Sequence, residues 1–227
     1  MLASSCSIYG FQEGILTEES KINPLTTYAK ANYLAEEAVF GLADNKFVVT
    51  VLRQSTVYGL SPRMRFDLAI NGMTLGFYNN KKIPVMRDGK QWRPFVHVKD
   101  TSRAFISVLT ADKEIVNKQM FNVGSNDQNC QILPLAEIVA KGAGFPFNFE
   151  WYGDPDHRSY RVSFDKISKI LRFKTIYKPS DGAKEISKAL DEKIVVASPK
   201  TKTVEWYKYL LDAQKTVEDV EYNGVIL

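Results

Sequence analysis

The sequence predicts an α/β fold built on a parallel sheet. Two short apolar runs, 47–52 and 120–123, are typical of strands that are covered on both faces in such a sheet. Helical patterns of apolar residues lie between these runs and continue after them. Strands that alternate with helices in this way indicate the α/β class.

The N-terminal elements are a strand end and a long helix. Residues 2–5 are predicted to end a strand that enters a turn at Tyr9-Gly10. A helix is predicted to start at Asn23-Pro24, because Asn is a good N-cap and Pro fits the first turn, and to close at Gly41. Its apolar residues recur at helical spacing, at Ala31, Leu34, Ala35, Ala38 and Val39.

Further elements follow along the chain. Asp88-Gly89 predicts the turn of a β-hairpin. Gly142-Ala143-Gly144 follows a helix and is expected to terminate it. The other predicted helices span 66–72, 101–110, 135–141, 165–171, 182–190 and 204–213, the last of them rich in aromatic residues.

Composition excludes several functional classes. The 30 basic and 26 acidic residues are interspersed, so no nucleic acid partner is expected. No stretch reaches the roughly 18 apolar residues of a membrane span, and no leader pattern is present. The two cysteines, Cys6 and Cys130, lack metal-site or disulfide spacing. We therefore expect a cytoplasmic protein without a metal, in which Cys6 is a small buried residue rather than a reactive thiol.

Two segments carry a family resemblance. Ser4–Gly10 (SSCSIYG) and Asn23–Tyr28 (NPLTTY) resemble the extended short-chain dehydrogenase/reductases of the NAD-dependent epimerase/dehydratase family, in which a Ser-Ser or Ser-Thr strand end precedes a helix with a YxxxK motif. The resemblance implies the C-terminal part of a Rossmann-type parallel sheet plus a smaller mixed α/β substrate-binding domain. Residues 1–60 would be the remnant of the NAD-binding domain, and 61–227 mostly the substrate domain, with 95–125 returning a helix and a strand to the sheet.

The resemblance also assigns catalytic roles. Tyr28 would remove the proton of a sugar hydroxyl during transient oxidation, and Ser5 would hold that hydroxyl by a hydrogen bond. A phenol acts as such a base near neutral pH when a nearby cation favours the phenolate. The family lysine position holds Asn32, which can bond the nicotinamide ribose but carries no charge. Lys30 lies about 200° round the helix from Tyr28 and is a poor substitute.

The residues after Ser5 separate the subclasses of the family. The 4,6-dehydratases follow this position with Asp-Glu, which supply the acid and the base for removing water. Here those positions hold Cys6 and Ser7, neither of which is a carboxylic acid. Epimerisation or simple redox chemistry is therefore favoured over dehydration, and Ser7 is expected to contact substrate.

Arginines are expected to bind the substrate pyrophosphate. Gln91–Asp100 resembles the family's R-x-[FY]-[IV]-H-V-x-D segment, whose arginine corresponds to Arg93 and matches phosphate oxygens bidentately. In this segment His97 is expected to be structural and Asp100 to cap the next helix. A second stretch similar to the family offers Arg158, with Arg161 as the next choice. Thr56 stands where family members commonly place an Asn that contacts the sugar or nucleotide.

The substrate implied by the resemblance is a nucleotide-diphosphate sugar, the cofactor is NAD or NADP, and the assembly is a homodimer formed through the Tyr-bearing helix. No glycine-rich strand-to-helix turn for a dinucleotide is present. Three functions stay open: an epimerase or reductase, a non-catalytic nucleotide-sugar-binding protein or fragment, and a structural or assembly subunit that dimerises through the Tyr-bearing helix.

Because the resemblance begins late in the family's pattern, we predict that the chain is truncated by a domain half on the order of 100 residues. The DNA directly upstream should then encode, in frame, a strand followed by a GxxGxxG turn. Sequencing that region tests the prediction, and a nearby in-frame stop codon would contradict it.

Overall fold

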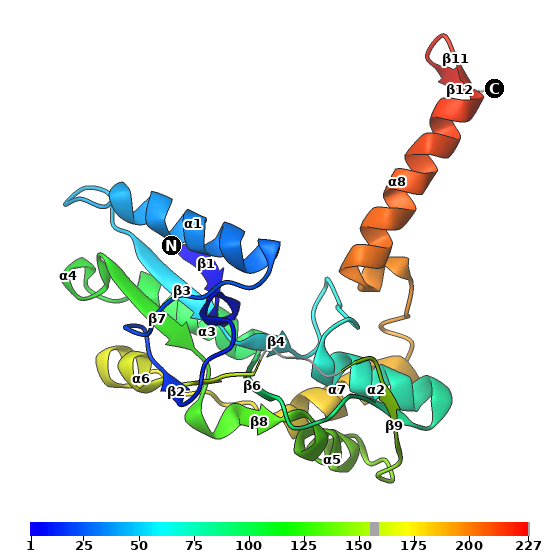
Figure 1. The fold of residues 1–227 in the computed structure, drawn as a ribbon, viewed down its shortest axis with the longest axis horizontal. Helices are drawn as coiled ribbons and strands as arrows, with labels where there is room; N and C mark the ends of the chain where they lie inside the picture. Colours follow the sequence, from blue (N-terminus) through cyan, green and yellow to red (C-terminus); the bar gives the residue numbers. More distant parts are fainter. Residues whose placement is uncertain (155–158, 227) are drawn as a thin grey trace.

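A three-stranded parallel sheet forms the part of the protein that contains the N-terminus (Figure 1). The computed structural model describes residues 1–154 and 159–226. The strand order is β1-β3-β7, with Ala3 opposite Leu52 and Leu52 opposite Phe121. The strands span Leu2–Ser5 (β1), Thr50–Gln54 (β3) and Gln119–Val123 (β7). Every residue of β3 is buried, so the prediction of a covered parallel sheet is confirmed.

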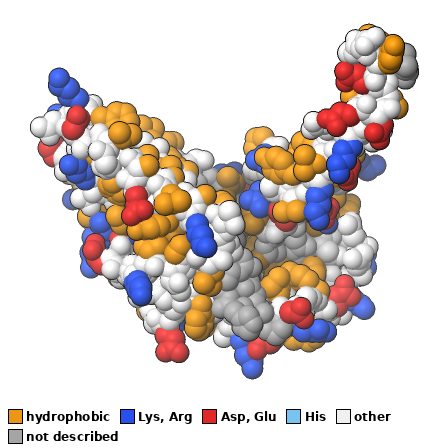
Figure 2. All heavy atoms as spheres, turned by 45° about the horizontal axis from the view of Figure 1, so that its top comes forward, with side chains coloured by type: hydrophobic (Ala, Val, Ile, Leu, Met, Phe, Trp, Pro, Cys, Tyr) orange, Lys and Arg blue, Asp and Glu red, His pale blue; other side chains and the backbone are white. Residues whose placement is uncertain are grey.

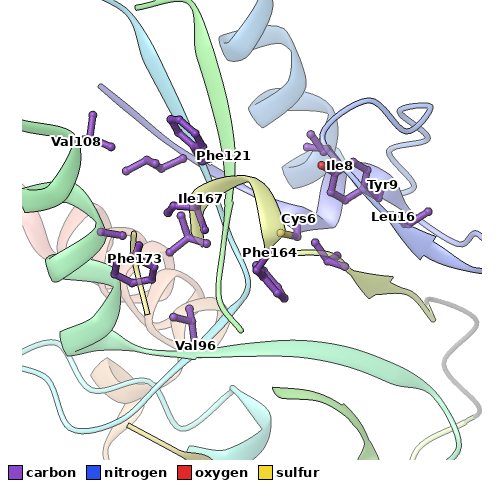
Figure 3. Close-up of a cluster of buried hydrophobic side chains, with 14 of the residues drawn as sticks. Cys6, Ile8, Tyr9, Leu16, Val96, Val108, Phe121, Phe164, Ile167 and Phe173 are labelled. Atoms are coloured by element: carbon purple, nitrogen blue, oxygen red, sulfur yellow. The ribbon is translucent and has the colours of Figure 1, made fainter. Parts of the chain in front are cut away.

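Helices pack against each strand of this sheet. The contacts are α1 with β1, α3 with β3 and α6 with β7, and Figure 3 shows side chains from the chain's start, β7 and α6 meeting in one core. This part of the molecule also contains a short parallel pair of strands, β2 with β10. The bounds are Cys6–Tyr9 (η1), Ile15–Leu16 (β2), Thr27–Gly41 (α1), Val98–Leu109 (α3), Lys113–Val116 (α4), Arg161–Val162 (β10) and Asp165–Leu171 (α6).

A second set of strands and helices lies beside the first (Figure 1). Here β6 pairs in parallel with β4 and antiparallel with β8, and β5 pairs in parallel with β9. Helices α2, α5 and α7 pack on one another around an apolar core. The bounds are Thr56–Tyr58 (β4), Ala69–Asn80 (α2), Ile83–Met86 (β5), Trp92–His97 (β6), Asn126–Gln128 (η2), Asn129–Gln131 (β8), Ile132–Ala143 (α5), Phe149–Tyr152 (β9) and Pro179–Asp191 (α7).

The C-terminal segment projects from the body as an arm (Figure 1). It begins with η3 (Pro199–Thr201), continues as the long helix α8 (Thr203–Val220) and ends in a hairpin of β11 (Glu221–Tyr222) and β12 (Val225–Ile226). No residue of α8 is buried. Within the described residues, no helix has both the length and the apolarity needed to cross a membrane.

A buried ion pair joins the Tyr-bearing helix to the sheet. Glu36 of α1 and Arg53 of β3 are both about 2% exposed, and their Oε2 and Nη2 atoms lie 2.7 Å apart. The Ser4 hydroxyl donates to the same carboxylate at 2.5 Å, and Arg53 Nη1 donates to the Tyr9 hydroxyl at 2.9 Å. The Tyr9 hydroxyl in turn donates to Asn122 of β7 at 2.7 Å. This network fixes α1, β1, η1, β3 and β7 relative to one another.

Several predicted boundaries are wrong: α2 spans Ala69–Asn80 instead of 66–72, and α8 spans Thr203–Val220 instead of 204–213. Two further shifts have local reasons. The Asp44 carboxylate accepts hydrogen bonds from the backbone N–H groups of Lys46 and Phe47, which holds a turn where the sequence predicts strand. β3 therefore begins at Thr50. Similarly, α1 begins at Thr27, because the Thr26 hydroxyl caps the helix by accepting from the Ala29 N–H at 3.1 Å.

The predicted hairpin at Asp88-Gly89 is also wrong. The turn forms, but the flanking strands β5 and β6 do not pair with each other, since β5 pairs with β9 and β6 with β4 and β8. Gly144, by contrast, ends α5 in the left-handed conformation with φ 74°, as predicted.

Asp100 does not cap helix α3. The N-cap is His97, whose Nδ1 accepts from the Lys99 N–H at 3.1 Å. Asp100 is fully buried and accepts from the backbone N–H groups of Ile176 and Tyr177, at 3.0 Å each for one carboxylate oxygen. It thereby holds the segment before α7 against α3.

Glu185 of α7 is a second polar link between elements. Its Oε1 lies 2.7 Å from His97 Nε2 and accepts from the Leu60 N–H at 2.7 Å, while Oε2 accepts from Lys99 Nζ at 2.9 Å. Burial opposes ionisation of this carboxyl group, but the three hydrogen bonds outweigh burial and lower its pKa to about 2. His97 is therefore a structural residue, as the sequence predicts.

Glu185→Gln should destabilise the fold by about 1–2 kcal/mol at pH 7. Because the folded pKa is depressed, the carboxylate's contribution is complete above its ordinary pKa of 4.5 and is lost as the pH falls toward 2. Urea unfolding between pH 7 and pH 3 measures the difference in unfolding free energy between the variant and the unmodified protein. This difference should shrink as the pH falls below about 4.5. Glu192→Gln, at the exposed C-cap of the same helix, serves as control. A difference in unfolding free energy that is constant with pH would contradict the assignment.

Candidate functional site

The Ser5 side chain lies at the carboxyl end of β1. Its Oγ accepts from the Ser7 N–H at 3.2 Å and so caps η1. The Ser7 hydroxyl and the Gln54 Oε1 are buried and have no hydrogen-bond partner within the described residues. Gln54 is the strand neighbour of Ser5. Unpartnered polar atoms at this edge provide hydrogen-bonding capacity for a ligand.

The turn after Ser7 requires glycine. Gly10 has φ 65°, and a Cβ at this position would stand 2.0 Å from the Asn23 carbonyl oxygen. The close approach brings the segment that leads into α1 against η1, and the Asn23 N–H donates to the Ile8 carbonyl at 2.9 Å. The SIYG turn thus sets where the Tyr-bearing helix begins.

Tyr28 lies in the first turn of α1, which packs against β1 and η1. Its side chain is 63% exposed. Asn32 donates one amide hydrogen to the Tyr28 carbonyl at 2.9 Å. Lys30 is exposed two residues further along the helix. The motif therefore presents an accessible phenol with an amide, not a cation, one helical turn away.

Cys6 is fully buried, as predicted. Its Sγ donates to the Arg53 carbonyl at 3.2 Å. Burial raises the pKa of this thiol well above its ordinary value, so a thiolate does not form near neutral pH.

A groove of about 590 Å³ brings Thr56 of β4 and Arg93 of β6 together. The two strands are parallel neighbours, with Thr56 opposite Phe95. The remaining lining residues come mainly from α2 and from β5, β9 and the turn before β6. Apolar and aromatic members include Met73, Met86, Phe95, Ile132 and Tyr152.

Arg93 is held by aromatic and backbone contacts. Its guanidinium lies 5.5 Å from the centre of the Tyr160 ring, and Nη1 donates to the Trp92 carbonyl at 2.9 Å. A guanidinium is planar and forked, a geometry that matches phosphate oxygens. Arg161 lies over the Trp92 ring instead and is not a groove residue. The predicted Arg158 lies outside the described residues.

Gln91 is a groove residue that the sequence prediction missed. It is 6% exposed, and its Oε1 has no hydrogen-bond partner among the residues described. The signal was the alternation along the strand, which places Gln91 on the same side as Arg93 and Phe95.

The groove and the Ser5 region share one edge of the molecule. Ser5 is in register with Gln54, and Thr56 follows Gln54 by two residues. Ligands of parallel α/β sheets bind outside the carboxyl ends of the strands. The structure thus brings Ser5, Ser7 and Thr56 toward this edge, although Ser5, Ser7 and Tyr28 do not line the groove itself.

Polar groups near the start of α1 suit one end of a dinucleotide. Tyr28, Asn32 and the unpartnered Ser7 hydroxyl offer donors and acceptors for a nicotinamide ribose. In 1–154 and 159–226, each strand-to-helix connection carries at most one glycine, so none forms the glycine-rich turn that receives a pyrophosphate.

Comparison with known proteins finds nucleotide-sugar epimerases among the relatives of this chain. A UDP-glucuronate 4-epimerase of Thermodesulfobacterium geofontis is 27% identical over 193 residues, which cover 81% of this chain and 56% of the relative. An uncharacterized UDP-glucose epimerase of Bacillus subtilis is 25% identical over 191 residues, which cover 80% of this chain and 57% of the relative. The chain therefore spans somewhat more than half the length of these relatives.

Solved structures show the same fold. A UDP-glucuronic acid 4-epimerase from Bacillus cereus, in complex with UDP-glucuronic acid and NAD, superposes with a TM-score of 0.71 at 23% identity, covering 84% of this chain and 60% of that one. A dTDP-glucose 4,6-dehydratase from Bacillus anthracis, in complex with NAD, gives a TM-score of 0.70 at 22% identity with the same coverage. The predicted Rossmann-type α/β class is confirmed.

The family follows from the part of the chain that holds the Ser-Ser strand end, the Tyr-bearing helix and the Arg93 strand. Residues 1–124, more than half of the 227, match one family along their whole length. The chain belongs to the NAD dependent epimerase/dehydratase family.

Proposed function

We propose that the chain forms the substrate-binding and proton-handling part of an NAD(P)-dependent nucleotide-sugar epimerase or reductase. The observation that carries this proposal is the groove in which Thr56 and Arg93 meet beside the Ser5 edge of the sheet. The similar proteins described above include epimerases and a dehydratase named for UDP- or dTDP-sugars. In this proposal 1–60 contributes the cofactor side and 61–227 mostly the substrate side, with 95–125 returning to the sheet.

The groove suits a nucleotide sugar in size and chemistry. Its polar side chains include Thr56, Gln91 and Arg93, and methionine and aromatic residues supply apolar walls. The other polar residues that line it are Asp67, Asn79, Asn80 and Lys202. Such a mixture is typical of small-molecule sites, in which apolar walls supply contact area and a few polar groups fix orientation. Arg93 binds the pyrophosphate, and Arg158 is a second candidate for that role.

Arg93→Ala should weaken binding of a UDP-sugar roughly 10- to 100-fold, because charge-assisted bonds to phosphate are lost. Isothermal titration calorimetry of the whole chain and of the variant, with UDP-glucose and with UDP-glucuronic acid, measures the effect. The matched control is Arg161→Ala, which removes an arginine that also lies over an aromatic ring but is not in the groove. Equal losses in both variants would show that net charge, not the groove, governs affinity.

The proposed chemistry centres on a sugar hydroxyl. When bound, NAD or NADP supplies the hydride acceptor for its oxidation. Ser5 holds the hydroxyl oxygen, and the Tyr28 phenolate takes its proton. Ser7 and Thr56 hold neighbouring sugar hydroxyls. Cys6 and Ser7 offer no carboxylic acid for removing water, so epimerisation or reduction is the proposed outcome.

A non-catalytic nucleotide-sugar-binding protein is the second candidate. It is favoured by Asn32, which brings no positive charge to stabilise a phenolate at Tyr28 and which donates to the backbone of its own helix. In this alternative the Arg93 groove still binds the nucleotide sugar, but no reaction follows.

Asn32→Lys separates the two candidates when the protein is expressed with the residues encoded directly upstream. If the site is catalytic, the added cation should raise the epimerisation or reduction rate on a UDP-sugar by about 10- to 100-fold. The same substitution in a Tyr28→Phe background is the control and should show no increase. No turnover in any variant, with UDP-sugar binding intact, would support the binding protein and exclude the enzyme.

A homodimer contact through α1 and a cytoplasmic location belong to the same proposal. The outward face of α1 bears exposed Leu34, Ala31 and Ala38, which a second copy would cover.

A further inference from the structure

Helix α8 carries an apolar seam although it packs on little of its own chain. Trp206, Leu210, Ala213, Val217 and Val220 follow one another at spacings of four, three, four and three residues. This is the spacing of positions a and d in a coiled coil, whose seam faces a partner helix. Leu210 is 42% exposed, and no residue of α8 is buried.

The charges of α8 avoid the seam and both of its flanks. Assigning Leu210 and Val217 to position a places every Asp, Glu, Lys and Arg of the helix on the outer positions b, c and f. The flanking positions e and g hold uncharged side chains. The charged residues are Glu205, Lys208, Asp212, Lys215, Glu218 and Asp219, and the flanking ones are Tyr207, Tyr209, Gln214 and Thr216. A second copy of the helix therefore meets no like charge along the seam.

The two ends of the arm are complementary in shape. At its base, Trp206, Tyr207 and Leu210 border a hollow of about 930 Å³ that the body completes with apolar residues of 60–64 and 194–196. Figure 2 shows hydrophobic side chains gathered where the arm leaves the body. At its tip, the β11–β12 hairpin exposes Tyr222, Val225 and Ile226. The base is concave, with apolar walls that also include Arg63 and Lys200. The tip is convex and presents apolar side chains.

We propose that α8 pairs with α8 of a second copy of this chain in antiparallel orientation, so that the hairpin of each copy enters the hollow of the other. In the matching register, Trp206 faces Val217 and Leu210 faces Ala213, so a large side chain meets a smaller one in each layer. A parallel pair would place Trp206 against Trp206 and Ala213 against Ala213, which crowds one layer and leaves a gap in another.

The antiparallel register also determines what the hairpin meets. Residues beyond Val220 of one copy come beside the residues that precede Thr203 of the other. Ser198, Lys200 and Thr201, which lie there, line the hollow. The contact is the same patch on both copies, so this interface taken alone closes as a two-fold dimer.

Leu210→Glu tests the seam in the whole chain. Two leucines leave the interface of each dimer, so the dissociation constant measured by sedimentation velocity should rise roughly 100-fold. The control is Leu211→Glu, which makes the same change one residue further on, at an outer position that is 59% exposed, and should leave association unchanged. Both variants leave α1 unchanged, so any association through α1 contributes equally to the two dissociation constants that are compared. Thermal unfolding by circular dichroism checks that both variants fold.

Cysteine cross-linking tests the orientation, in a Cys130→Ser background. Thr203 and Val220 are 17 residues apart, about 26 Å along one helix, so a disulfide between them joins two copies. The double variant Thr203→Cys, Val220→Cys should form covalent dimers on mild oxidation, whereas Val220→Cys alone should not.

Three outcomes would overturn the proposal. The first is a dissociation constant that is the same in Leu210→Glu and in the unmodified chain, the second is an equal rise of this constant in Leu211→Glu, and the third is efficient dimer formation by Val220→Cys alone. The first would show that the seam is not an interface, the second that it is not specific, and the third that the helices are parallel.

Discussion

The buried ion pair between Glu36 and Arg53 is the interaction on which the arrangement of the sheet and the Tyr-bearing helix depends. Two charges in a dry interior are costly unless their hydrogen bonds are satisfied, and here Ser4, Tyr9 and Asn122 complete the set. The pair holds α1 at one distance and one rotation relative to β1. Because Tyr28 is on α1 and Ser5 on β1, the same network fixes the positions of the backbones that carry the two proposed catalytic side chains.

Much of the fold was accessible from the sequence because its strongest signals are local. The β-branched run before Gln54 predicts a covered strand, and the apolar spacing from Ala31 to Val39 predicts a helix. Both elements exist, with shifted ends. The shifts come from single side chains, Asp44 and Thr26, whose bonds to nearby backbone N–H groups compete with the regular pattern.

Pairing between distant strands was harder to predict. Asp88-Gly89 has the composition of a hairpin turn, but the partners of β5 and β6 lie 35 to 66 positions away in the sequence. These strands pack against α2, α5 and α7. The site reflects the same limit. Motifs identified Ser5, Tyr28, Thr56 and Arg93 as candidates, whereas the meeting of Thr56 with Arg93, and the inclusion of Gln91, follow from the parallel pairing of β4 with β6.

The groove is built by strands and helices that are distinct from those bearing Ser5 and Tyr28. In the proposed function, recognition of the nucleotide and handling of the sugar proton therefore rest on separate sets of packing contacts. A substitution in the groove can change which base or sugar is bound without disturbing Ser5 and Tyr28. An uncharged residue at the family lysine position of α1, where this chain holds Asn32, conversely leaves binding of the nucleotide sugar intact. With such a division, a single substitution at position 32 of α1 would change the rate of turnover and leave the binding of the nucleotide sugar unchanged.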